Sequence, residues 1–170
     1  LANAEALASS LRGLPLRHLD LGYNSLRDEG AEALLAAVGT GLEALRLGRN
    51  ALELPGIRAI ARKGMLPRLR WLDIGCSRAG AAAMRVLAEA ETLCGLEKLD
   101  MRFDYAELKD EGMTDMMASP VLRNVRWLDL SSNGIGPAGA RAIAEADRPA
   151  GFWHFDLYHN PVGDEGAMAL

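Results

Sequence analysis

The feature that most constrains the fold is a nine-residue pattern that recurs along the chain. It has the form apolar-x-x-apolar-x-apolar-x-x-polar, occurs six times, and starts at residues 16, 42, 69, 96, 125 and 152. Successive starts are 26, 27, 27, 29 and 27 residues apart, and four of the six copies end in Asn. A fixed period of this length indicates a repeat architecture, in which each unit packs mainly against its neighbours. We therefore expect one domain over residues 1-170.

Each copy of the pattern predicts a short strand followed by a turn. The fourth and sixth residues are apolar and alternate with polar or variable ones, as in a strand with one buried face. The Asn stands where the chain leaves the strand, and its amide can hydrogen-bond backbone groups of the turn and of neighbouring units. Ser77 and Asp104 replace Asn in the third and fourth units. Less regular turns are expected there.

The residues after each turn favour a helix. Asp28, Asp110 and Asp164 are each followed by Glu and Gly, and they are candidates for helix N-caps. Pro55 and Pro137 suit the first turn of a helix. Apolar residues then recur at helical spacing, and a recurring Gly lets one helix approach the next closely. Each unit is therefore expected to be strand, turn and helix.

This unit resembles the ribonuclease-inhibitor-like class of leucine-rich repeats, and its alanine-rich style is similar to bacterial members. The resemblance covers nearly the whole chain and includes the apolar residues Leu26, Leu52, Ile135 and Val162 after the turns. It implies an α/β fold, a right-handed solenoid shaped as a horseshoe arc, with parallel strands on the concave face and helices on the convex face. Residues 2–11 look like the helix of a preceding unit. The chain is therefore expected to be a segment of a longer protein.

The predicted concave face carries the candidate binding residues. In this register the third, fifth and seventh residues of each unit project from the sheet. Exposed Trp, Tyr and Arg are enriched among the residues that dominate binding energy at interfaces. The candidate partner-binding residues are Trp71, Lys98, Trp127, His154, Asp73, Asp100, Asp129, Asp156, Arg102, Phe103 and Tyr158.

Two of these groups also have a structural interpretation. Lys98 could lie between Trp71 and Trp127 as a cation–π sandwich that stabilises the sheet and binds nothing. The row of aspartates could attract a basic partner and speed its association. Alternatively, each aspartate could hydrogen-bond locally while staying hydrated. Both pairs of alternatives stay open at the level of sequence.

Composition and motifs narrow the class of function. A net charge of −4 and a pI near 5.4 argue against nucleic-acid binding, and no apolar run is long enough to cross a bilayer. There is no phosphate-binding loop, nucleophile motif or converging ligand set, so no catalytic residue, cofactor or metal is expected. Cys76 and Cys94 lie far apart in this register and are expected as free thiols, which favours the cytoplasm.

The leading hypothesis is a monomeric scaffold module that recognises a partner protein on its concave sheet. A regulator similar to Ran GTPase-activating proteins, which share the repeat class and stimulate another protein's hydrolysis, is the alternative. A structural spacer within a longer polypeptide is the third. Binding through the sheet requires Trp71 and Trp127 to project from it, whereas substitutions on a spacer's exposed face would be silent.

Overall fold

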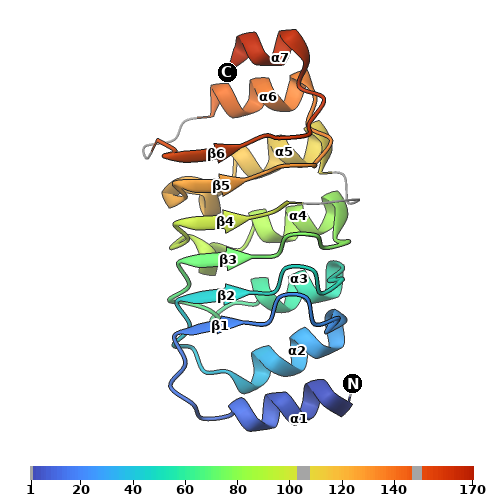
Figure 1. The fold of residues 1–170 in the computed structure, drawn as a ribbon. Coiled ribbons are helices and arrows are strands. Elements are labelled where there is room, and N and C mark those ends of the chain that lie inside the picture. The colour runs from blue at the N-terminus through green and yellow to red at the C-terminus, as the bar shows by residue number, and fades with distance from the viewer. Residues whose placement is uncertain (1, 103–107, 147–150) are drawn as a thin grey trace.

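Short strands and helices alternate along the computed structural model, which describes residues 2–102, 108–146 and 151–170 (Figure 1). Each strand holds the third to fifth residues of a repeat: β1 His18–Asp20, β2 Ala44–Arg46, β3 Trp71–Asp73, β4 Lys98–Asp100, β5 Trp127–Asp129 and β6 His154–Asp156. The helices are α1 Ala2–Leu11, α2 Arg27–Ala37, α3 Leu54–Ala61, α4 Gly80–Ala88, α5 Lys109–Met117, α6 Pro137–Glu145 and α7 Gly163–Ala169. Two 3₁₀ turns, η1 Glu91–Leu93 and η2 Pro120–Asn124, precede β4 and β5. The helix expected at residues 2–11 is confirmed as α1.

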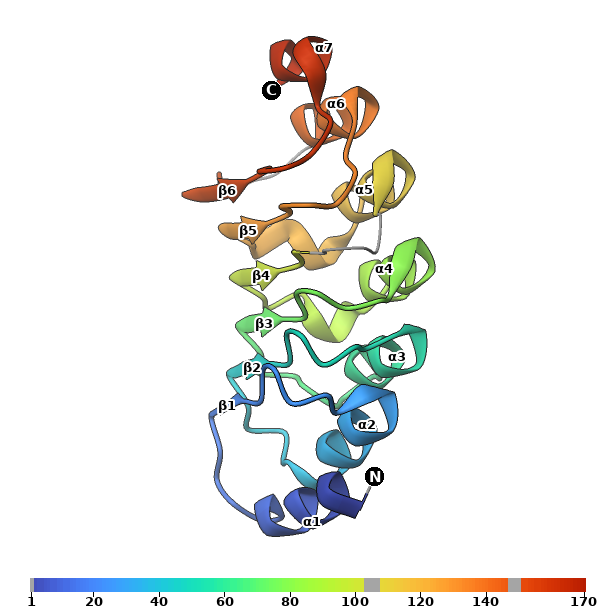
Figure 2. The same cartoon turned by 45° about the vertical axis from the view of Figure 1, so that its right-hand side comes forward.

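The six strands form one open parallel sheet in sequence order, β1 to β6. Equivalent repeat positions are paired, so that Trp71 lies beside Lys98 and Lys98 lies beside Trp127. Figure 2 shows the strands along the inner side of a shallow arc and the helices along its outer side. The expected α/β solenoid, with strands on the concave face, is confirmed.

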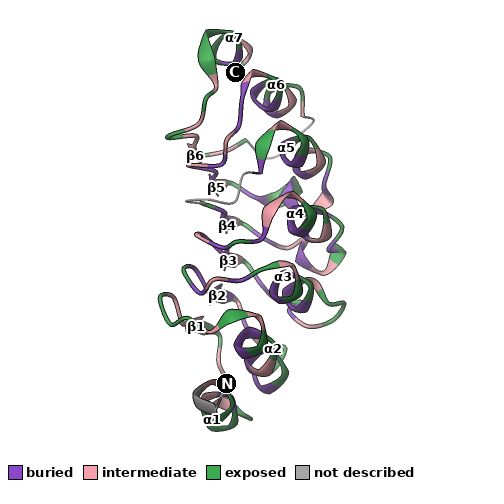
Figure 3. Cartoon of the chain, turned by 90° about the vertical axis from the view of Figure 1, so that its right-hand side faces the viewer, coloured by how far each residue is buried: buried purple, intermediate pink, exposed green. Residues whose placement is uncertain are grey.

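The apolar core lies between the sheet and the helices. Figure 3 shows the buried residues of the helices on the side that faces the sheet. The repeat pattern assigned the fourth and sixth residues of each unit to the core. In the four inner repeats all of these residues are fully buried: Leu45, Leu47, Leu72, Ile74, Leu99, Met101, Leu128 and Leu130. Each such side chain contributes roughly 1.5–3 kcal/mol of transfer free energy. Leu19 and Phe155 of the end strands are only partly buried, because each has a neighbouring repeat on one side.

The asparagine at the end of the pattern ties adjacent repeats together. Asn50 is fully buried, and its Nδ2 donates to the carbonyls of Leu21 at 2.7 Å and Leu47 at 2.9 Å. Its Oδ1 accepts the backbone N–H groups of Asn24 and Leu26, both at 3.1 Å. The predicted role of this amide, which is to satisfy backbone groups of its own turn and of a neighbouring repeat, is confirmed.

The turns share a left-handed residue just before the asparagine position. The φ angles of these residues lie between +55° and +63° at Tyr23, Arg49, Cys76, Ser132 and His159. Three turns have a second left-handed residue two positions later, at Ser25, Ala51 and Gly134. Arg78 in the Ser77 repeat has no such angle, but neither has Pro161 in the Asn160 repeat, so this angle does not set the Ser77 turn apart. The other turn expected to be irregular, at Asp104, lies outside the described residues.

None of the three aspartates expected to cap its own helix does so, and two of them, Asp28 and Asp110, instead cap the next one. Helices α2 and α5 begin at Arg27 and Lys109 without a side-chain cap. The Oδ1 atom of Asp28 accepts the N–H groups of Glu53 and Gly56 at the start of α3, at 2.8 and 2.9 Å. The prediction of self-capping is wrong, because the acid lies inside the first turn of its own helix and reaches the unpaired N–H groups across the repeat interface.

Asp110 confirms that this arrangement recurs. Its Oδ1 accepts the N–H groups of Gly136 and Gly139 at the start of α6, at 2.7 and 2.8 Å. A Cβ added at Gly139 would lie 2.6 Å from that oxygen. The recurring glycine therefore permits a close approach between adjacent repeats, as its position in the sequence predicts.

Two further expectations can be compared with the described residues. Among these residues, no helix combines the length and the apolar character that a membrane span needs. Cys76 and Cys94, both described, are not joined by a disulfide bond.

Candidate functional site

The third-position side chains project from the concave face of the sheet. Trp71, Lys98 and Trp127 are each half-buried, whereas the leucines that follow them in β3, β4 and β5 are fully buried. The alternation in each strand therefore places the tryptophans outside the core, as predicted. His154 of β6 is also half-buried and continues the row.

Two cationic side chains, one from each neighbouring strand, lie against the Trp71 ring. The Arg46 guanidinium carbon lies 5.2 Å from the ring centroid, and Lys98 Nζ lies 5.2 Å from it. Lys98 Nζ also lies 5.9 Å from the centroid of Trp153, which is 65% exposed. These distances are typical of cation–π contacts.

The predicted sandwich of Lys98 between Trp71 and Trp127 is thus wrong in its second partner. Trp127 stacks on His154 instead, with centroids 4.6 Å apart and an interplanar angle of 7°. The second aromatic partner of Lys98 is Trp153, which directly precedes β6 and whose ring lies near the Lys98 ammonium group. The repeat position of Trp153, the second of its unit, does not belong to the outward rows.

The expected hydrated row of aspartates is not found at its centre. Asp73, Asp100 and Asp129 are only 7%, 4% and 4% exposed. The local hydrogen bonds that the alternative interpretation expects are present. In each of the five aspartates, Oδ1 accepts the backbone N–H of the residue two positions later, at 2.7–3.2 Å: Asp20 from Gly22, Asp73 from Gly75, Asp100 from Arg102, Asp129 from Ser131 and Asp156 from Tyr158. The central aspartates therefore shape the turn rather than face solvent.

Two arginines neutralise much of this row. Arg46 bridges Asp20 at 2.6 Å and Asp73 at 3.4 Å. Arg102 bridges Asp100 at 2.6 Å and Asp129 at 3.2 Å. Arg46 thus joins the repeats on either side of its own, whereas Arg102 joins its own repeat to the next one. The field available to steer a basic partner is therefore much smaller than the number of aspartates suggests.

Burial and pairing act in opposite directions on Asp100. Burial raises the pKa of its carboxyl above the ordinary value, although the hydrogen bond from Arg102 lowers it and the charge of Asp73 raises it further. The pKa of the Arg102 guanidinium is raised, chiefly by its hydrogen bond to Asp100. Arg102 thus remains charged and holds the buried carboxylates in place.

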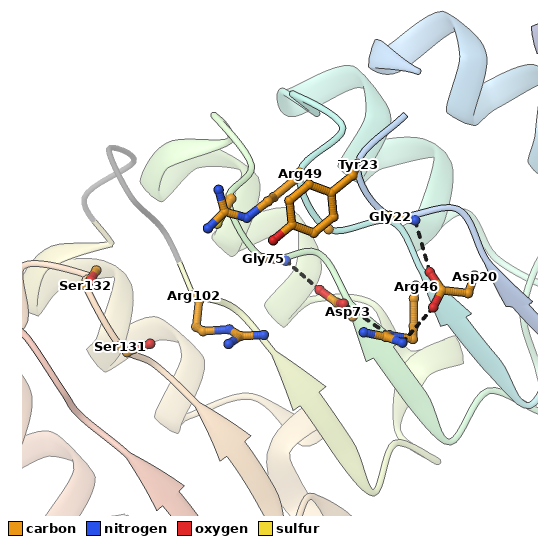
Figure 4. Close-up of a pocket in the computed structure, with 12 residues that line it drawn as sticks. Asp20, Gly22, Tyr23, Arg46, Arg49, Asp73, Gly75, Arg102, Ser131 and Ser132 are labelled. Atoms are coloured by element: carbon orange, nitrogen blue, oxygen red, sulfur yellow. Dashed lines mark hydrogen bonds and ion pairs between the residues drawn. The ribbon is translucent and has the colours of Figure 1, made fainter. Parts of the chain in front are cut away.

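A hollow of about 400 Å³ lies beyond the ends of the strands (Figure 4). Arg46, Asp73 and Arg102 line it from below, and the Arg49 guanidinium lies 5.0 Å from the centroid of the Tyr23 ring above. The hollow stays open because glycines line it: a Cβ at Gly48 would lie 2.6 Å from the Asp73 carboxylate. This place can accept a polar side chain of a partner.

The remaining candidates lie at the far end of the face or outside the described residues. Tyr158 is 75% exposed, its ring centroid lies 6.0 Å from that of His159, and Asp156 is half-buried. Phe103 lies outside the described residues. Among the described residues, no group of three or more His, Cys, Asp or Glu side chains is placed to hold a metal ion.

Comparison with known proteins identifies the repeat. Residues 15–35, 121–144 and 154–170 match the family described as Leucine Rich repeat. No curated protein sequence matches the chain. The matched stretches include β1, β5 and β6, and the same strand and register continue through the repeats between them. Three stretches of the chain thus match the leucine-rich repeat, and the units of the chain stack into an α/β solenoid.

Proposed function

We propose that this protein is a scaffold module that binds a partner protein on its concave sheet and acts as a monomer. Leucine-rich repeats generally mediate protein–protein interaction and are typically non-enzymatic. The observation that carries the proposal is the clustering of the chain's three tryptophans, Trp71, Trp127 and Trp153, on one exposed face with Lys98 and His154.

The geometry of this face suits a binding surface. Six strands about 4.8 Å apart give a row nearly 25 Å long, comparable with the dimension of a small interface. Large aromatic side chains held by neighbouring contacts lose little conformational freedom when a partner covers them. Removal of one such anchor commonly costs about 2 kcal/mol or more, which corresponds to about 30-fold in Kd.

The buried aspartates have a supporting role in this proposal. Asp73, Asp100 and Asp129 hold Arg46 and Arg102 at the surface, where the guanidinium groups can contact a partner. No feature of the described residues favours regulation of a GTPase over binding alone. The proposed contacts are therefore made by the aromatic and cationic side chains rather than by the acidic row.

A double substitution tests the proposal. Trp71→Ala with Trp127→Ala should preserve the far-UV circular dichroism spectrum and lose the partner in affinity capture from the native source. Arg85→Ala is the matched control, because Arg85 lies on helix α4 at the outer side and pairs with exposed acids. Equal capture by the wild type and the double variant would reject binding through this face and favour a spacer.

A further inference from the structure

We infer that the concave face recognises an acidic segment of its partner, with carboxylates docking around Lys98. This inference rests on the proposed function and specifies the chemistry of the partner. It reverses the expectation from the row of aspartates, because those acids are largely buried and paired. Lys98 keeps a positive charge without an ion-pair partner among the described residues, and the half-buried Asp156 keeps a negative one at the far end of the row.

Lys98 differs from the arginines of the face in its partners. Arg46 and Arg102 each bridge two carboxylates. The ammonium group of Lys98 lies over the rings of Trp71 and Trp153, and within the described ranges no carboxylate lies at ion-pair distance from it. The aromatic rings orient the ammonium group but leave its full charge without a counter-ion. A carboxylate from a partner would supply one.

The indole N–H of Trp71 adds to the positive potential at this point. Its Nε1 is buried and, within the part of the chain that the structure describes, has no hydrogen-bond acceptor. A buried donor without an acceptor costs about 1–3 kcal/mol. Since Lys98 also lies against this ring, a full positive charge and a partial positive charge meet at one place, whereas the charge of Arg46 is offset by Asp20 and Asp73. An anionic group nearby would be stabilised by the ammonium group and the indole N–H.

A second cation lies at the start of the next strand. Arg126 is exposed, and its carbonyl accepts the N–H groups of Trp153 and His154, so its backbone lies beside both. Among the described residues, Arg126 also has no carboxylate partner at ion-pair distance. Glu97, whose carbonyl accepts the backbone N–H of Arg126, pairs with Arg70 at 3.6 Å. Lys98 and Arg126 therefore place two unneutralised charges at the starts of adjacent strands.

An acidic peptide fits this patch better than a nucleic acid does. The whole chain carries a net charge of −4, which opposes a long polyanion. Lys98 and Arg126 lie at the starts of β4 and β5, and the exposed ring of Trp153 lies beside Lys98, where it can accept an apolar residue between two acids. Local charge complementarity of this kind steers association and fixes register.

Titration of the intact chain with three probes tests the inference. The probes are a terminally capped hexaglutamate peptide, a capped hexalysine peptide and a hexauridylate oligonucleotide. The readout is the set of indole ¹H–¹⁵N resonances, because all three tryptophans lie on this face. Hexaglutamate should shift the Trp71 and Trp153 resonances in a saturable, salt-dependent manner, and hexalysine should not.

Substitution of the lysine provides the matched comparison. Lys98→Met keeps most of the aliphatic stem and removes the charge, so the Kd for hexaglutamate should rise at least about tenfold. Lys98→Arg should retain binding. Lys63→Met is the control, because Lys63 is an exposed lysine just after α3 at the other layer of the fold, and it should bind hexaglutamate like the wild type.

Each contrary result identifies which statement is wrong. Equal shifts with hexalysine, tighter binding of hexauridylate, no shift with hexaglutamate, or unchanged affinity in Lys98→Met would overturn the acidic-partner inference. If the Trp71→Ala, Trp127→Ala variant loses its captured partner while hexaglutamate fails to bind the wild type, only this inference is wrong. If that variant captures its partner normally, the proposed function itself is wrong.

Discussion

Replacement of Asn50 by Ala should destabilise the protein far more than the same change at Asn24. Both residues occupy the last place of the repeat pattern, but Asn50 has a repeat on each side. Its amide donates to the Leu21 and Leu47 carbonyls and accepts two backbone N–H groups, four contacts at 2.7–3.1 Å, and a longer contact of 3.4 Å runs to the Gly48 carbonyl. The side chain is fully buried, so water does not readily replace these bonds.

The magnitude follows from the number of bonds. At about 1 kcal/mol net for each hydrogen bond, the loss of four predicts a decrease of about 4 kcal/mol in the free energy of unfolding. This is a large part of the roughly 5–15 kcal/mol typical of a folded domain. The Asn24 amide is exposed and donates to the carbonyls of Leu21 and Gly22 at 3.1 and 2.8 Å. Water can replace those contacts, so Asn24→Ala should cost less than about 1 kcal/mol.

Urea unfolding followed by far-UV circular dichroism measures both variants. The midpoint should fall strongly for Asn50→Ala and slightly for Asn24→Ala, with similar slopes. A loss of the same size in both would show that the amide acts within its own turn. The contribution of the neighbouring repeat, on which this reasoning depends, would then be refuted.

Three further predictions concern the same face of the sheet. Gly48→Ala should lower the free energy of unfolding by about 1–3 kcal/mol, because the added Cβ would lie 2.6 Å from a carboxylate oxygen of Asp73. Gly39→Ala is the control: its Cβ would meet nothing within 4 Å, so the same urea titration should show little change. The raised pKa of Asp100 means that the folded state binds this proton more tightly than the unfolded state does. The free energy of unfolding of the wild type, relative to that of Asp100→Asn, should therefore fall as the pH rises from the ordinary pKa of 3.8 through the raised pKa. A difference between the two proteins that does not change with pH would contradict this sign. Arg102→Met should lower the free energy of unfolding by about 2 kcal/mol, because it leaves the buried carboxylates of Asp100 and Asp129 without a partner. Arg85→Met is the control and should change thermal stability little, since the acidic partners of Arg85 lie at the surface.

The repeat pattern was sufficient to predict the fold. Alternation within each nine-residue unit assigned residues such as Leu72 and Leu99 to the core, and both are fully buried. The asparagine amide at Asn50 was predicted to bond across repeats, and it does. These features depend on local periodicity and on the stacking of identical units, and both are readable in one chain.

The helix caps show where local patterns fail. Asp28 stands at a helix start and is a good N-cap candidate by sequence, yet it caps the following helix. A carboxylate near a helix start can serve any unpaired N–H group within its reach. Which helix it serves depends on the distance between adjacent repeats, which the residues around Asp28 do not encode.

The sequence by itself determined the period, the strand faces, the leucine core and the parallel solenoid, because repetition makes every repeat interface nearly the same. Only the tertiary structure decided how the outward side chains pair. Arg46 and Arg102 cover the aspartates, and Lys98 lies over Trp153 rather than Trp127. Long side chains choose among several neighbours about 5 Å apart on adjacent strands, and that choice depends on reach and competing charges rather than on periodicity. The sign of the charge left on the concave face follows from those pairings.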